Sequence, residues 1–249
     1  MPNFDLLIRQ GTLVTPSGVG QGDVGIRGGR IAAIGELDPA EAGETIEALG
    51  LHVLPGVIDT QVHFREPGAE HKEDLEHGLK GAALGGVTAV FEMPNTSPLT
   101  TDAERLADKI ARAGARAACD FAFYVGATPD NVGQLAALER RPGCCGVKVF
   151  MGSSTGDLLI EDDDTLRAVL ASGSRRVAVH AEDESRLRER RAIAEESGDV
   201  AAHAEWRDAE TAFRATRRLL ELSRETGRRV HALHITTAAE MELLAAAKD

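Results

Sequence analysis

A row of polar side chains along one short stretch has the composition of a reactive site. Within residues 59–65, the residues of one parity are Asp59, Gln61, His63 and Arg65. Because side chains alternate across a strand, all four would lie on one face. Such groups are costly against an apolar core but suit a metal ion and an anionic substrate. A polar strand end that enters a Pro-Gly turn explains the stretch equally well.

Lys148 interrupts the otherwise apolar stretch Gly146–Met151. An unpaired ammonium in a buried strand is very unfavourable, so this lysine needs a role. It could pair with a carboxylate or extend its amine to the end of the strand. It could also form a Schiff base, act as a general base, or carry a CO2-derived carbamate that bridges two metal ions.

Two further strands end in histidine. His180 closes the strand predicted at 176–180, and His231 and His234 belong to the strand predicted at 229–235. Residues three apart point to opposite faces of a strand, so we expect His234 to face the site and His231 to face the helices. Imidazoles with an oxygen bridge suit zinc and similar divalent ions. The candidate ligands are His63, Lys148, His180 and His234.

The elements that must position these residues alternate from residue 51 onward. Strands are predicted at 53–58, 87–93, 117–125, 146–151, 176–180 and 229–235. Helices are predicted at 71–84, 101–114, 129–139, 161–172, 183–196 with 203–226, and 237–248. The order implies a parallel sheet, either doubly wound or closed into a barrel. Polar residues at the carboxyl ends of the strands favour a (β/α)8 TIM-type barrel.

The number of strand–helix units and the signals at the helix ends make this α/β prediction more specific. A barrel needs eight units and about six are visible, so we expect the last two to be missing from this chain. Thr101 and Glu104 form a predicted capping box, while Gly85 and Gly227 predict helix ends. Residues 51–249 would form the incomplete barrel.

The first 50 residues form a different kind of unit. Short β-type stretches at 4–8, 12–15, 22–26 and 30–34 are separated by glycine-containing pairs. The pairs Gln10-Gly11, Ser17-Gly18 and Gly28-Gly29 are predicted to be hairpin turns. Residues 1–50 therefore predict a small antiparallel sheet.

Composition excludes several classes of protein. The 249 residues carry a formal net charge of −12, which disfavours nucleic-acid and anionic membrane surfaces. No apolar stretch approaches the ~20 residues of a membrane span, and the first residues lack a secretory signal. Cys119, Cys144 and Cys145 fit neither a disulfide framework nor a metal motif. We expect a cytoplasmic protein with a small-molecule substrate.

These motifs together resemble the cyclic-amidohydrolase branch of the amidohydrolase superfamily, and dihydroorotases in particular. Residues 59–68 are similar to the pattern D-x-H-x-H-F-R-E-P-G, and Gly85–Thr88 with Met93–Thr96 resembles G-G-[VIT]-T…M-P-N-T. The strand around Lys148 is similar to the one that bears a carbamylated lysine. His180 and the segment 234–237 match the two later histidine motifs. The resemblance covers essentially the whole chain, with residues 1–50 as part of a β-sandwich.

The resemblance implies a site with two zinc ions per subunit, or other divalent ions, and a bridging hydroxide. It makes His63 a ligand of the first metal, carbamylated Lys148 the bridge, and His180 and His234 the ligands of the second. Arg65 and Asn95 would hold a substrate carboxylate. Asp59 would support the ligands from behind.

Two departures from the family pattern concern catalysis. Gln61 stands where the first histidine ligand is expected, and its oxygen is a weaker, neutral ligand for zinc. The family's general-base aspartate follows the eighth strand, so it is absent from this chain. These 249 residues alone are therefore expected to be inactive.

The resemblance predicts a dihydroorotase that interconverts dihydroorotate and N-carbamoyl-L-aspartate in pyrimidine synthesis. An allantoinase or hydantoinase is the alternative enzyme. A non-catalytic scaffold that binds aspartate transcarbamoylase is the alternative from another class, and Gln61 is the feature in its favour. A homo-oligomer is expected in each case.

Overall fold

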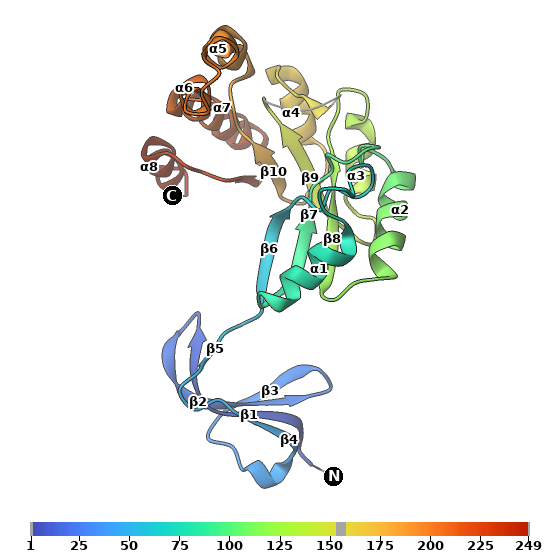
Figure 1. The fold of residues 1–249 in the computed structure, drawn as a ribbon, viewed down its shortest axis with the longest axis vertical. Coiled ribbons are helices and arrows are strands. Elements are labelled where there is room, and N and C mark those ends of the chain that lie inside the picture. Colours follow the sequence, from blue (N-terminus) through green and yellow to red (C-terminus); the bar gives the residue numbers. More distant parts are fainter. Residues whose placement is uncertain (1, 153–157, 249) are drawn as a thin grey trace. The chain divides into compact units, whose positions relative to one another are not determined.

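The computed structural model describes residues 2–152 and 158–248. The chain divides into two compact units, residues 1–57 and 58–249. Figure 1 shows the strands and helices of each unit.

The N-terminal unit is a five-stranded sheet. Its strands are β1 (Phe4–Thr15), β2 (Gly18–Arg27), β3 (Arg30–Gly35), β4 (Ala42–Glu47) and β5 (His52–Val53). The order is β3-β2-β1-β4, and β5 pairs with the second half of β1. Strands β1, β2 and β3 are antiparallel neighbours, whereas β4 and β5 run parallel to β1. A 3-10 turn, η1 (Pro39–Glu41), precedes β4.

Two of the three predicted hairpin turns are present, and the third is wrong. Ser17-Gly18 and Gly28-Gly29 connect β1 to β2 and β2 to β3. Gln10-Gly11 lies inside β1, where the pairing with β2 shifts register. Gln10 has φ 56°, so the glutamine adopts a left-handed conformation and the strand continues past it. The Asp23 carboxylate accepts the Gln10 amide at 2.8 Å and stabilises this irregularity.

The second unit is a six-stranded sheet whose strands follow one another in sequence order. They are β6 (Val57–Val62), β7 (Val87–Glu92), β8 (Asp120–Gly126), β9 (Cys144–Phe150), β10 (Val177–His180) and β11 (Val230–Ala232). The pairs from β7 to β11 are parallel. The sheet curls into an open half-barrel, which confirms the incomplete α/β barrel (Figure 1).

Helices connect the strands and cover the outer face of the sheet. They are α1 (Leu75–Leu84), α2 (Ala103–Gly114), η2 (Val132–Gln134) with α3 (Leu135–Leu138), α4 (Asp163–Ala171), α5 (Glu184–Ser197), α6 (Ala202–Trp206), α7 (Ala209–Thr226) and α8 (Ala238–Ala246). The connection between β10 and β11 is the long one, because it contains three helices. Aspartate N-caps begin α1, α2, α4, α5 and α7.

Two apolar clusters lie on opposite faces of the sheet. The larger joins strand residues such as Val147, Val149, Val177 and Val179 to the covering helices. The smaller, on the inner face, consists of Met93, Tyr124, Ala178 and Leu233, with Phe91 and Cys145 packed against them. Lys148 lies on the inner face as well, because it pairs in register with Ala178 of the neighbouring parallel strand.

Two local predictions are corrected. The first barrel strand is β6 at residues 57–62 rather than a buried strand at 53–58, and Val57 and Ile58 are 52% and 56% exposed. They are exposed because β6 is an edge strand of its sheet. The N-cap of α2 is Asp102, whose carboxylate accepts the Arg105 amide at 2.9 Å. The helix therefore starts one residue later than the predicted capping box. The predicted ends at Gly85 and Gly227 are confirmed.

Candidate active site

His63 lies just past the carboxyl end of β6. The Met93 amide donates to the Val62 carbonyl at 3.0 Å, so the ends of β6 and β7 are joined next to the histidine. His63 Nδ1 is 2.9 Å from Asn95 Oδ1. Because an amide oxygen only accepts, this contact places the ring proton on Nδ1 and leaves Nε2 with a free lone pair. Burial lowers the pKa of His63 to about 4, and the Arg65 guanidinium also lowers it.

The predicted polar row does not continue through Arg65. The strand ends at Val62, and Arg65 has φ 62°, which breaks the alternation on which the parity argument rested. Arg65 still lies near the histidine, since its charge acts on the pKa of His63. The next residue, Glu66, is buried and anchors the loop by accepting the Leu75 amide at 3.0 Å and Arg116 Nη2 at 2.6 Å.

Lys148 is buried on β9 as predicted, with 1% of its surface exposed. Its Nζ has no hydrogen-bond partner among the residues that the structure describes. The amine lies 4.4 Å from the centroid of the Phe150 ring. Burial lowers the pKa of Lys148 well below its usual value, so the amine is neutral and nucleophilic at a much lower pH than an exposed lysine.

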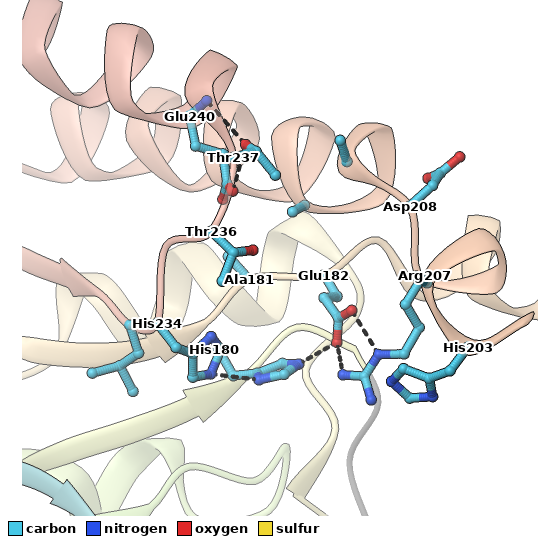
Figure 2. A pocket seen from close by; sticks show the side chains of 14 residues that line it. His180, Ala181, Glu182, His203, Arg207, Asp208, His234, Thr236, Thr237 and Glu240 are labelled. Carbon is cyan, nitrogen blue, oxygen red and sulfur yellow. Dashed lines mark hydrogen bonds and ion pairs between the residues drawn. The ribbon is translucent and has the colours of Figure 1, made fainter. Parts of the chain in front are cut away.

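His180 ends β10 and is held from both sides. Its Nε2 is 2.6 Å from Glu182 Oε2, and its Nδ1 is 2.9 Å from His234 Nε2. Figure 2 shows the two rings facing each other, with Glu182 and Arg207 behind His180. Burial by itself raises the pKa of Glu182, but the hydrogen bonds from His180 and Arg207 lower it to about 2. Glu182 is therefore a carboxylate that can only accept.

The two histidines of the sixth strand lie differently from the prediction. His231 pairs in register with Ala178, an inner-face residue, so His231 lies on the inner face and not toward the helices. The neighbours Val230 and Ala232 pack on the outer cluster instead. His234 reaches His180 because β11 has ended at Ala232 and His234 adopts φ 39°. The prediction assumed that the strand continues to residue 235, so the alternation of side chains could not reveal this change of direction.

Gln61 and Asp59 lie on β6. Gln61 is partly exposed, and its backbone N–H donates to Asp59 Oδ1 at 2.9 Å. Asp59 is exposed and lines a separate cavity on the side of α1, together with Phe64 and His77. The support of the metal ligands by Asp59 stays a prediction.

The remaining candidate residues converge. Burial is the largest cause of the lowered pKa of both His63 and His234. Lys148 further lowers the pKa of both histidines, as do His234 for His63 and His180 for His234. His180 and His234 line a cavity of about 490 Å³ that extends over α6 and the start of α8. It is the cavity drawn in Figure 2.

Sequence reasoning missed two residues of this cavity. Glu182 follows His180 by two positions, and that spacing is a local signal for a carboxylate that contacts the histidine. Arg207 follows α6, 25 residues after Glu182, so no local sequence pattern indicates its contact with Glu182. Arg207 Nε donates to Glu182 Oε1 at 2.8 Å, and its Nη2 also contacts Glu182 Oε2.

The donor chemistry fits a divalent metal ion. No group of three or more His, Cys, Asp or Glu side chains among residues 2–152 and 158–248 is arranged to hold a metal ion. The strand ends instead present imidazole nitrogens together with the buried Lys148 amine, which has no hydrogen-bond partner in the described part of the chain. Converted to a carbamate, this amine would add the anionic oxygens that zinc and similar ions accept.

Comparisons with known proteins show which families this chain resembles. A dihydro-orotase-like family model matches residues 50–142. The allantoinase of Deinococcus radiodurans is 36% identical over 97% of this chain and 55% of its own length. The allantoinase of Rubrobacter xylanophilus is 38% identical over 100% of this chain and 56% of its own length. The structure of L-hydantoinase (dihydropyrimidinase) from Arthrobacter aurescens matches with a TM-score of 0.91 and 31% identity, over 98% of this chain and 56% of that one.

The chain belongs to the cyclic amidohydrolase superfamily. It spans a little over half the length of the curated cyclic amidohydrolases that it matches. The more specific prediction of a dihydroorotase is not supported, because the two curated relatives above are allantoinases and the solved structure is a hydantoinase. None of the helices in the described part of the chain has the length and hydropathy of a membrane span.

Proposed function

We propose that this cyclic amidohydrolase opens the ring of a cyclic ureide, a five-membered hydantoin ring such as that of allantoin. The observation that carries the proposal is the buried Lys148 amine, without a partner among the described residues, beside the imidazoles of His63, His180 and His234. The names of the relatives, allantoinase and hydantoinase, narrow the substrate from cyclic amides to this ring.

Lys148 is suited to carbamylation. A neutral amine attacks CO2, a nitrogen–carbon bond forms, and one proton leaves, so that the side chain becomes an anion with two oxygens. Burial favours the neutral amine that this reaction needs, because it lowers the pKa of Lys148. Carbamylated Lys148 would be the anionic ligand that holds two divalent metal ions, with zinc as the expected metal.

The histidines would complete the site. His63, through Nε2, would hold the first metal ion with Gln61 beside it, and His180 and His234 would hold the second. Divalent metal ions held by these residues would polarise the ring carbonyl and lower the pKa of a bound water. Water then adds to the carbonyl carbon, the ring C–N bond breaks, and the ring nitrogen leaves with a proton. The resemblance assigns that proton to an aspartate after the eighth strand, which has no counterpart in these 249 residues.

Dihydroorotate is the second candidate substrate. Arg65 lies close enough to act on the pKa of His63, and Asn95 contacts the same ring. Asn95 uses Oδ1 for His63, which leaves its Nδ2 donors for a ligand. A guanidinium and an amide beside the ligands suit a substrate carboxylate, which dihydroorotate has and hydantoin lacks.

A substrate panel tests the proposal on the intact protein. Allantoin, hydantoin, dihydrouracil and dihydroorotate are compared by kcat/KM, with zinc content and intact mass measured on the same sample. We expect bound zinc, an added CO2 that is lost in Lys148→Met, and turnover of allantoin or hydantoin. Turnover of dihydroorotate alone would favour the second candidate. No metal, no turnover and co-purification with a transcarbamoylase would favour a scaffold.

A further inference from the structure

Glu182 sits between a histidine and an arginine with little access to solvent. Its side chain is 12% exposed, and those of His180 and Arg207 are 13% and 24% exposed. Arg207 contacts both carboxylate oxygens, and one of these oxygens also contacts His180 Nε2. Bidentate pairing of a planar guanidinium fixes the orientation of a carboxylate as well as its charge.

The backbone on both sides of Glu182 is fixed. The Asp183 amide donates to the Thr211 carbonyl at 3.1 Å, which ties the start of α5 to α7. A Cβ on Gly152 would lie 2.5 Å from the Glu182 carbonyl oxygen, so the Gly152 backbone packs directly against this peptide. The position of the carboxylate is therefore set by neighbouring segments and not by its own loop alone.

The long connection between β10 and β11 delivers Arg207. Arg207 ends α6, and its amide donates to the His203 carbonyl at 3.0 Å. The preceding residue anchors α6 on α5, because Trp206 Nε1 donates to the Leu187 carbonyl at 2.7 Å. Figure 2 shows Arg207 extending from this segment to Glu182.

The carboxylate decides which nitrogen of His180 carries the proton. Because Glu182 only accepts, His180 Nε2 must donate, and the neutral ring then keeps its lone pair on Nδ1. That lone pair faces His234 Nε2 at 2.9 Å. One proton lies between His180 Nδ1 and His234 Nε2. A metal ion that replaced this proton could be bound by both nitrogens.

We propose that Arg207 and Glu182 are positioning residues that fix the tautomer and ring orientation of His180, and so prepare the His180–His234 pair to bind a divalent metal ion. The proposal rests on the proposed function, because it concerns the same site. It assigns a role to the long connection that contains α5, α6 and α7, because this connection supplies Arg207, 25 residues after Glu182. Partners of this kind change metal affinity by roughly 10- to 100-fold.

The experiment measures zinc affinity by competition with a chromophoric chelator, and the tautomer of His180 by 15N NMR of the metal-free intact protein. The variants are Glu182→Ala, Arg207→Met and Arg207→Lys. Arg186→Met is the matched control, because Arg186 makes a similar two-point pair with Asp208 in the same helices without touching an imidazole. The His180 resonances are assigned by their loss in His180→Gln.

We expect Glu182→Ala to weaken zinc binding by roughly 10- to 100-fold and to remove the preference for a proton on Nε2. Arg207→Met is expected to weaken binding less, and Arg207→Lys to restore part of the affinity. Arg186→Met should leave affinity and tautomer unchanged even where it lowers the melting temperature. An unchanged tautomer in Glu182→Ala, or an equal loss of affinity in Arg186→Met, would overturn the proposal. If the wild type binds no zinc, the proposed function fails, and the tautomer measurement still decides this inference.

Discussion

Lys109 and Glu92 form an ion pair in which both side chains are almost fully buried, with exposed fractions of 1% and 2%. The lysine also donates to the Met93 carbonyl at 3.1 Å. Burial raises the pKa of Glu92 to about 7, although the Lys109 ammonium opposes the rise. The pair joins α2 to the end of β7, three residues before Asn95.

Removing one member of this pair should be costly. Lys109→Met leaves the Glu92 carboxylate buried alone, and we expect the free energy of unfolding to fall by about 3–5 kcal/mol. The double variant Lys109→Met with Glu92→Leu removes both charges and should recover most of that loss. Denaturant unfolding of the single and double variants checks this. A double variant as unstable as the single one would contradict it.

Glu66 should make stability depend on pH. Burial raises the pKa of Glu66, but the hydrogen bonds from the Leu75 amide and from Arg116 outweigh it, so the folded pKa lies below the unfolded one. The stabilisation is therefore complete above the unfolded carboxyl pKa of about 4.3 and is lost as the pH falls through the folded pKa.

The variant Glu66→Gln should lower the free energy of unfolding by about 1.5–3 kcal/mol at pH 7. Its difference from the wild type should shrink below about pH 4, where the wild-type carboxylate takes up a proton. Urea unfolding at pH 7, 5 and 3 measures this difference. The exposed Glu242→Gln serves as the control, and a pH-independent difference in Glu66→Gln would refute the assignment.

Two glycines of α1 should respond to alanine with opposite signs. A Cβ on Gly78 would lie 2.4 Å from the Phe64 ring, whereas a Cβ on Gly81 meets nothing within 4 Å. We expect Gly78→Ala to cost about 1–3 kcal/mol through displacement of Phe64, next to His63. Gly81→Ala should add up to about 1 kcal/mol, since alanine favours the helix. Thermal unfolding of both variants checks the signs, and a stabilised Gly78→Ala would show that Phe64 moves freely.

Replacing Lys148 should separate stability from function. Lys148→Met removes a buried amine that lacks a partner among the described residues, so we expect the metal-free protein to gain about 1–3 kcal/mol of stability. The same variant should lose metal binding. The exposed Lys80→Met is the control and should change stability by less than about 0.5 kcal/mol. A large loss of stability in metal-free Lys148→Met would indicate that the amine has a structural partner.

The sequence alone determined the alternation of strands and helices and the polar groups at the strand ends. Hydrophobic periodicity and N-cap residues act over a few positions, so the six βα units were predictable. The convergence of His63, Lys148 and His180 followed from one rule, that parallel strands present their carboxyl ends at one edge.

Only the tertiary structure decided how the individual side chains reach the site. His231 lies on the inner face, and His234 turns back to His180 because the strand ends at Ala232 and His234 itself has a left-handed backbone. The Glu182–Arg207 pair spans 25 residues and the His180–His234 contact spans 54. Such contacts depend on how helices pack on the sheet, and no local pattern in the sequence encodes that packing.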